Sequence, residues 1–126
     1  MPHLLELFSG AQGIGNSFRM RGWQVTSVDI DERALPTICC DIMELDAGEI
    51  QEYFGPVDLI WASPPYTHHS CPLESDALVS KVLDLADQLC CYYLLENPTQ
   101  RPSKDSPHHA WYQQRSARLL QVWHGI

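Results

Sequence analysis

Short apolar runs alternate with helix-forming segments along the chain, and this alternation limits the fold more than any other feature. The clearest run is 57–62, Val-Asp-Leu-Ile-Trp-Ala, which Pro64 and Pro65 follow closely. Such a run indicates a strand that is buried on both faces. Strands that alternate with helices predict a parallel sheet covered by helices on both sides. We therefore expect an α/β fold with a doubly wound, mostly parallel, Rossmann-like sheet. The predicted strands are 4–8, 24–30, 37–41, 57–62, 92–95 and 119–123, and the predicted helices are 13–21, 47–54, 77–90 and 109–118, with one helical turn at 32–35 and a loop over 98–110.

Glycine, proline and capping residues mark the ends of the predicted helices. Gly22 follows the first helix at the position where a left-handed residue commonly ends one. Gly55-Pro56 ends the helix at 47–54, and Ser75 or Asp76 can cap the helix at 77–90.

Length and composition predict one globular domain over residues 1–126. Hydrophobic residues make up 44% and charged residues 19%, which excludes a disordered chain. The net charge of −8 argues against a protein that coats nucleic acid non-specifically. The charge is uneven, however, because residues 97–126 carry a net charge of +3 and the remainder carries −11.

The cellular compartment and the thiol chemistry follow from what the sequence lacks. No apolar run approaches the length of about 18 residues that a membrane span needs, and residues 1–6 do not have the form of a signal peptide. The five cysteines include the adjacent pairs Cys39-Cys40 and Cys90-Cys91, which make a poor disulfide framework and poor metal-ligand spacing. We expect a cytoplasmic protein with reduced thiols and no metal site.

Polar residues stand where the predicted strands end. They are Ser9-Gly10, Asp29, Asp41, Ser63 and Glu96-Asn97. Ligands of open parallel sheets bind outside the carboxyl ends of the strands, so these residues predict one site along one edge.

The first of these strand ends carries a glycine-rich turn, residues 8–15, with the spacing G-x-x-G-x-G. Glycines let the backbone approach a ligand closely. Asp29 ends the next strand, where a carboxylate can accept hydrogen bonds from both hydroxyls of a ribose. Together with Asp41-Ile42, this order of features predicts a cofactor of the adenosine type.

These same residues carry a family resemblance. Residues 6–15, Asp29-Ile30 and Asp41-Ile42 resemble the first three motifs of the DNA cytosine-5 methyltransferases, residues 62–70 resemble their catalytic loop, and Glu96-Asn97-Pro98 resembles their Glu-Asn dipeptide. The likeness is greatest to short phage-encoded members, which act in the cytoplasm of the host cell. It implies a minimal S-adenosylmethionine-dependent methyltransferase fold without a target recognition domain, and a DNA base flipped out of the duplex. It places Asp29 on the ribose and Asp41 near the adenine amine. The implied cofactor-binding residues are Phe8, Ser9, Gly10, Gln12, Gly13, Ile14, Gly15, Asp29, Ile30, Asp41 and Ile42.

The chain departs from that family at the catalytic nucleophile, because Tyr66 stands where the family has a cysteine. A phenol with a pKa of about 10 does not replace a thiolate in attack on the cytosine ring. Ser63-Pro64-Pro65-Tyr66 is also similar to the motif of amino-methyltransferases that act on adenine N6 or cytosine N4, whose chemistry needs no covalent nucleophile. Four alternatives remain: a DNA methyltransferase, an amino-methyltransferase, an inactive cofactor- or DNA-binding homologue with a regulatory role, or a methyltransferase that acts on RNA or a small molecule. The stretch 29–58, with nine acidic residues and one basic residue, would suit a regulator that mimics DNA. The candidate catalytic residues are Ser63, Pro64, Pro65, Tyr66, Glu96 and Asn97.

The base-rich C-terminal part is where the sequence predicts contact with DNA. Residues 112–118 loosely resemble the Gln/Arg motif of the cytosine-5 enzymes, in which arginines can hold a phosphate. The segment before it is too short for a target recognition domain, so a partner subunit or a homodimer would have to supply sequence recognition. The candidate nucleic-acid contacts are His68, His69, Arg101, Lys104, Arg115 and Arg118.

Overall fold

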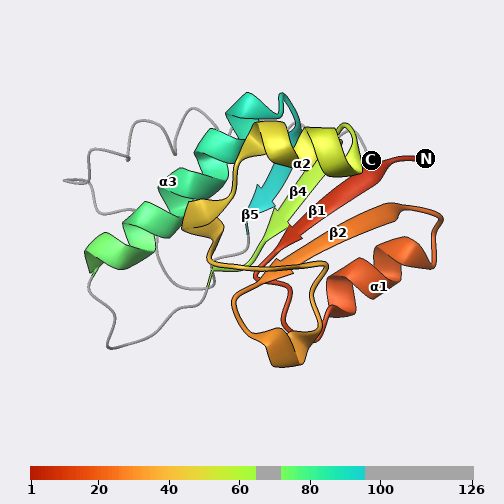
Figure 1. The fold of residues 1–126 in the computed structure, drawn as a ribbon, viewed down its shortest axis with the longest axis horizontal. Coiled ribbons are helices and arrows are strands. Elements are labelled where there is room, and N and C mark those ends of the chain that lie inside the picture. The colour runs from red at the N-terminus through yellow and green to blue at the C-terminus, as the bar shows by residue number, and fades with distance from the viewer. Residues whose placement is uncertain (65–71, 96–126) are drawn as a thin grey trace. The chain divides into compact units, whose positions relative to one another are not determined.

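The computed structural model of the chain describes residues 1–64 and 72–95 (Figure 1). These residues lie in one compact unit, Met1–Glu96. The predicted loop at 98–110, helix at 109–118 and strand at 119–123 lie outside the described residues, and the single domain over 1–126 stays a prediction.

Five parallel strands form one sheet in the order β3-β2-β1-β4-β5. This order is Rossmann-like and confirms the predicted α/β fold with a parallel sheet. The strands are β1 (His3–Leu7), β2 (Gln24–Asp29), β3 (Ile38–Cys39), β4 (Leu59–Ala62) and β5 (Tyr92–Leu95).

Helices cover both faces of the sheet, as the alternating pattern predicts. Figure 1 shows α1 on one face and α2 and α3 on the other. In residues 1–64 and 72–95, no helix is both long and apolar enough to cross a membrane. The helices are α1 (Gly13–Arg19), α2 (Ala47–Phe54) and α3 (Pro72–Gln88), with the short 3-10 turns η1 (Glu32–Ala34) and η2 (Ile42–Glu44).

The predicted boundaries of α2 and β5 agree with the structure, whereas the start of α3 was predicted wrongly. The helix begins at Pro72, so neither Ser75 nor Asp76 occupies its N-cap position. Proline suits the first position of a helix, because its φ is already helical and it has no N–H to satisfy. The η2 turn was not predicted.

Gly22 ends α1 as its position predicts. It has a φ of +84°, and its N–H donates to the Arg19 carbonyl at 3.1 Å. The next N–H, of Trp23, donates to the Phe18 carbonyl at 3.1 Å, and the two rings meet edge to face with centroids 4.9 Å apart. This hydrogen-bond pair and the accompanying apolar contact form a Schellman ending, which turns the chain into β2.

The hydrophobic core lies between the sheet and the helices α2 and α3. From the sheet it takes alternate residues of the central strands, which share one face because successive side chains point to opposite sides. From α3 it takes residues at three- and four-residue spacing, the periodicity that predicts this helix. Its largest members are Leu5, Leu7, Val28, Ile42, Leu45, Ile50, Val57, Ile60, Val82, Leu85 and Leu89.

The opposite face of β1 and β2 packs closely against α1. A Cβ added at Gly15 would collide with the carboxylate of Glu6 and would lie 3.1 Å from Val25 Cγ1. The helix therefore approaches the sheet as closely as it does because residue 15 has no side chain.

Replacing Gly15 with alanine should therefore destabilise the fold by about 1–3 kcal/mol, because the added methyl group overpacks a buried contact. The matched control is Gly13→Ala in the same helix, where a Cβ meets no atom within 4 Å. Alanine there should leave the free energy of unfolding unchanged or raise it by up to about 1 kcal/mol. Urea unfolding of the two variants measures the difference, and equal midpoints would contradict the close contact.

Candidate functional site

The candidate site lies at the carboxyl edge of the sheet, where the strand order reverses between β1 and β4. Ligands of such sheets bind in the crevice at this reversal. The register pairs Leu7 of β1 with Val28 of β2 and with Ala62 of β4. The residues that follow in the three strands are Phe8, Asp29 and Ser63, so the structure brings these predicted site residues to the same level of the edge.

The glycine-rich loop after β1 alternates between left-handed and ordinary backbone. Phe8, Gly10 and Gln12 have φ values of 56°, 48° and 60°. The loop is fixed by backbone hydrogen bonds from Ser9 N to the Val28 carbonyl at 3.0 Å and from Gln12 N to the Ser9 carbonyl at 2.8 Å. Gly13 then begins α1 and has open space at its Cβ position. At Gly10 and Gly13 no atom lies within 4 Å of the Cβ position, so the backbone is open at these two residues.

Asp29 ties this loop to the end of β2. Its Oδ2 accepts a hydrogen bond from Gly10 N at 2.8 Å, and its Oδ1 accepts one from Asp31 N at 2.8 Å. Each carboxylate oxygen has two acceptor positions, so Asp29 can still accept a further hydrogen bond at each oxygen. Ile30 beside it is 71% exposed, which leaves an apolar side chain available at the same edge.

In the second Asp-Ile pair, Asp41 lies on the surface and Ile42 lies in the core. The exposed Asp41 carboxylate accepts a hydrogen bond from Met43 N at 3.0 Å and begins η2. Ile42 is 3% exposed and packs in the core. A ligand contact at this position would therefore involve Asp41, or only the backbone of Ile42.

The remaining predicted site residues are described only in part. Ser63 is half-buried and Pro64 is buried, directly after β4. Ile14 is half-buried in α1. The others lie outside the described residues: Pro65, Tyr66, His68, His69, Glu96, Asn97, Arg101, Lys104, Arg115 and Arg118.

Two polar side chains, one in β1 and one in the glycine-rich loop, are buried, and each has an oxygen without a hydrogen-bond partner among the described residues. Glu6 is 3% exposed, and neither its Oε2 nor the Ser9 Oγ has a partner among the described residues. Burial raises the pKa of Glu6, while the Gly15 N–H and the positive charge of Arg19 oppose that rise. Glu6 belongs to the first motif of the resemblance, but its burial against α1 was not predicted from the sequence.

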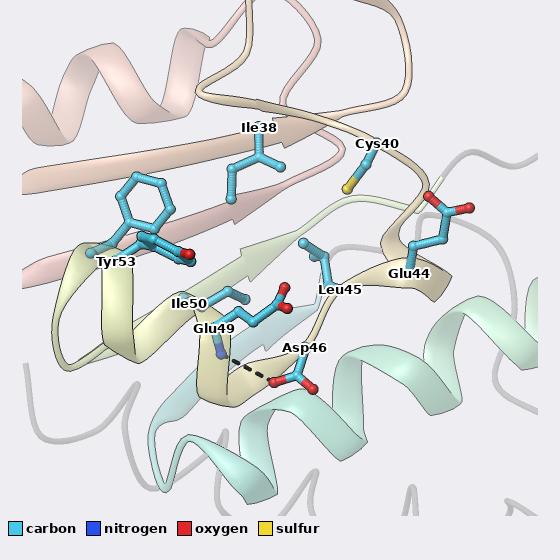
Figure 2. A pocket seen from close by; sticks show the side chains of 9 residues that line it. Ile38, Cys40, Glu44, Leu45, Asp46, Glu49, Ile50 and Tyr53 are labelled. Atoms are coloured by element: carbon cyan, nitrogen blue, oxygen red, sulfur yellow. Dashed lines mark hydrogen bonds between the residues drawn. The ribbon is translucent and has the colours of Figure 1, made fainter.

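A cavity of about 530 Å³ lies elsewhere, beside β3, η2 and α2 (Figure 2). None of the residues predicted to bind the cofactor lines it. Burial raises the pKa of the Cys40 thiol, as do the nearby charges of Glu44 and Asp41. That thiol is therefore a poor nucleophile. The cavity is lined by Ile38, Cys40, Glu44, Leu45, Asp46, Glu49, Ile50, Tyr53 and Phe54.

The described part of the chain holds no cluster of metal ligands. Among the described side chains, no three or more His, Cys, Asp or Glu residues gather as metal ligands. His68, His69 and Cys71 lie outside that part.

Comparison with known proteins does not assign the chain to a family. No model of a protein family matches the chain, and no curated protein matches it significantly. The α/β class and the Rossmann-like strand order therefore come from the sheet itself, and the methyltransferase resemblance stays a prediction.

Glu6→Gln tests the buried carboxyl. Glutamine keeps the shape and an oxygen that can accept from Gly15 N, but it does not ionise. Because the folded-state pKa of Glu6 lies above its ordinary value of 4.5, the stabilising contribution of the protonated acid is complete below that value. It is lost as the pH rises through the folded-state pKa.

The variant should therefore gain stability relative to the wild type as the pH rises from about 4 to about 7. Urea unfolding at several pH values measures this difference. A difference that stays constant over the range, or that changes in the opposite direction, would contradict the raised pKa.

Proposed function

We propose that the chain is an S-adenosylmethionine-dependent methyltransferase of the DNA-modifying type, with its cofactor bound at the carboxyl edge of β1, β2 and β4. The observation that carries this proposal is the 2.8 Å hydrogen bond between Gly10 N and Asp29 Oδ2. It brings a loop of exposed backbone together with a carboxylate that can hold a ribose, at the point of the sheet where ligands bind.

The donors and acceptors at this edge fit the cofactor. Asp29 keeps acceptor capacity for the ribose hydroxyls, and the exposed Ile30 offers an apolar surface to the adenine ring. The exposed Asp41 can accept a hydrogen bond from the adenine amine. Gly10 and Gly13 are exposed and have open space at their Cβ positions, so the loop backbone is accessible to a polar group at these two residues. When bound, the cofactor supplies an electrophilic methyl group.

The sequence after β4 favours transfer to an exocyclic amine over transfer to a ring carbon. Ser63-Pro64-Pro65-Tyr66 provides a hydroxyl and a carbonyl that can orient an amine, and an aromatic ring that can stack on a flipped base. It provides no thiolate. Contact with DNA is assigned to the base-rich segment 97–126, so we expect weak, salt-sensitive binding that a partner subunit or a second copy makes specific.

A second function is favoured by the same tyrosine. With Tyr66 in place of the family's cysteine, the chain can be a cofactor- or DNA-binding homologue that has lost catalysis and acts as a regulator. The two functions share the cofactor site and differ in methyl transfer.

Asp29→Asn tests the cofactor site. Asparagine removes the negative charge and one acceptor oxygen, so affinity for S-adenosylmethionine should fall by about tenfold or more. Asp84→Asn, on the exposed side of α3, is the control with the same change in charge and should bind like the wild type. Isothermal titration measures both. Failure of the wild-type protein to bind at high micromolar cofactor would overturn the proposed function.

Methyl transfer to DNA separates the enzyme from the inactive homologue. With labelled cofactor, the wild-type protein should form N6-methyladenine or N4-methylcytosine, which mass spectrometry of the nucleosides identifies. Tyr66→Cys supplies the thiolate that attack on the cytosine ring needs. If only this variant is active, and its product is 5-methylcytosine, then the chain is an inactive member of the cytosine-5 type.

A further inference from the structure

The Gln12 side chain connects three parts of the candidate site. Its amide nitrogen donates to the carbonyl oxygens of Ala34 at 3.0 Å and Leu35 at 2.8 Å. Its amide oxygen accepts from Arg19 Nη1 at 3.0 Å. Ala34 and Leu35 end the η1 turn that follows β2, and Arg19 is the last residue of α1. One side chain thus joins the glycine loop, the turn at 30–35 and α1.

The chemistry of these partners fixes the orientation of the amide. A guanidinium group only donates hydrogen bonds and a carbonyl oxygen only accepts them, so the Gln12 oxygen has to face Arg19 and its nitrogen has to face η1. Arg19 is itself held by a second hydrogen bond from Nη1 to Asn16 Oδ1 at 2.9 Å. A glutamate at position 12 would turn an oxygen toward two carbonyl oxygens and would lose both hydrogen bonds to the turn.

The backbone of Gln12 also indicates that this side chain is needed. Its φ is 60°, in the left-handed region where glycine is the residue without strain. A side chain in this conformation is strained, and such outliers persist where surrounding contacts hold them. Here the hydrogen bonds to Ala34, Leu35 and Arg19 hold it.

We propose that Gln12 is a positioning residue that fixes the spacing between the glycine loop and the turn at 30–35, and that its side chain does not itself contact the cofactor. Asp29 joins the same two segments through Gly10 N and Asp31 N, so the loop and the turn are held together at two separate points. The ligand that these two segments would bind rests on the proposed function, whereas the link between loop and turn is a property of the free protein.

Gln12→Glu is the decisive variant, because it changes the hydrogen-bonding of the amide with almost no change in shape. Its control is Gln51→Glu, the same substitution at an exposed position of α2. Amide hydrogen exchange of the free proteins should be several-fold faster in segments 8–12 and 30–35 of Gln12→Glu and unchanged in β1 and α3. The control should match the wild type. Unchanged exchange in the two segments, or an equal acceleration throughout the protein, would overturn the proposal.

Ligand binding gives the second readout. Gln12→Met removes the hydrogen bonds without adding a charge, and should weaken S-adenosylmethionine and S-adenosylhomocysteine by the same factor, on the order of tenfold. A change in affinity for only one of them would indicate direct contact with the cofactor and would overturn the proposal, as would wild-type affinity for both. If the wild-type protein binds neither compound, the proposed function fails, and the exchange measurement still decides whether Gln12 links loop and turn.

Discussion

The burial of β1 at the centre of the sheet is the constraint on which the rest of the structure depends. All of its side chains, His3–Leu7, are buried, and it pairs with β2 along one edge and with β4 along the other. Leu5 and Leu7 face the core with α2 and α3, and Glu6 faces α1. The order that puts β1 in the centre also puts the reversal of strand order beside it. The position of the candidate site therefore follows from the same constraint as the core.

The two ends of the sheet satisfy their buried polar groups differently. At the amino end, the His3 ring is buried. Its Nδ1 lies 2.9 Å from the Pro56 carbonyl oxygen, and its Nε2 lies 2.7 Å from Thr26 Oγ1. Because a carbonyl only accepts, Nδ1 carries a proton and donates to it, and in the neutral ring Nε2 accepts from the hydroxyl. Toward the carboxyl end, Glu6 Oε2 and Ser9 Oγ have no partner among the described residues. Buried polar groups are normally hydrogen-bonded, so these two oxygens are exceptions within residues 1–64 and 72–95.

Several aspartates in residues 29–58, the acidic part of the chain, accept hydrogen bonds from backbone N–H groups. Asp29 accepts from the backbone N–H groups of Gly10 and Asp31, and Asp58 accepts from His3 N at 2.8 Å. Asp31, Asp41 and Asp46 each accept from a backbone N–H two or three residues further on and begin η1, η2 and α2. Aspartate favours such turns and caps because its short side chain reaches the nearby N–H groups. The negative charge is therefore tied to the short elements that connect the strands, and it is not in itself an argument for a nucleic-acid mimic.

The sequence by itself determined the alternation of strands and helices, the parallel sheet, the extent of α2 and β5, and the glycine ending of α1. These features depend on periodicity and on residues such as Gly22 and Gly55, whose effect is local. The sequence also predicted that Ser9-Gly10, Asp29 and Ser63 lie at one edge of the sheet, because parallel strands end at the same edge. Only the tertiary structure decided that Ile42 belongs to the core, that Glu6 is buried under α1, and that the Gln12 amide is bonded to the η1 turn. Each of these depends on contact between segments that are distant in the chain, and residue type and spacing do not encode which of them meet.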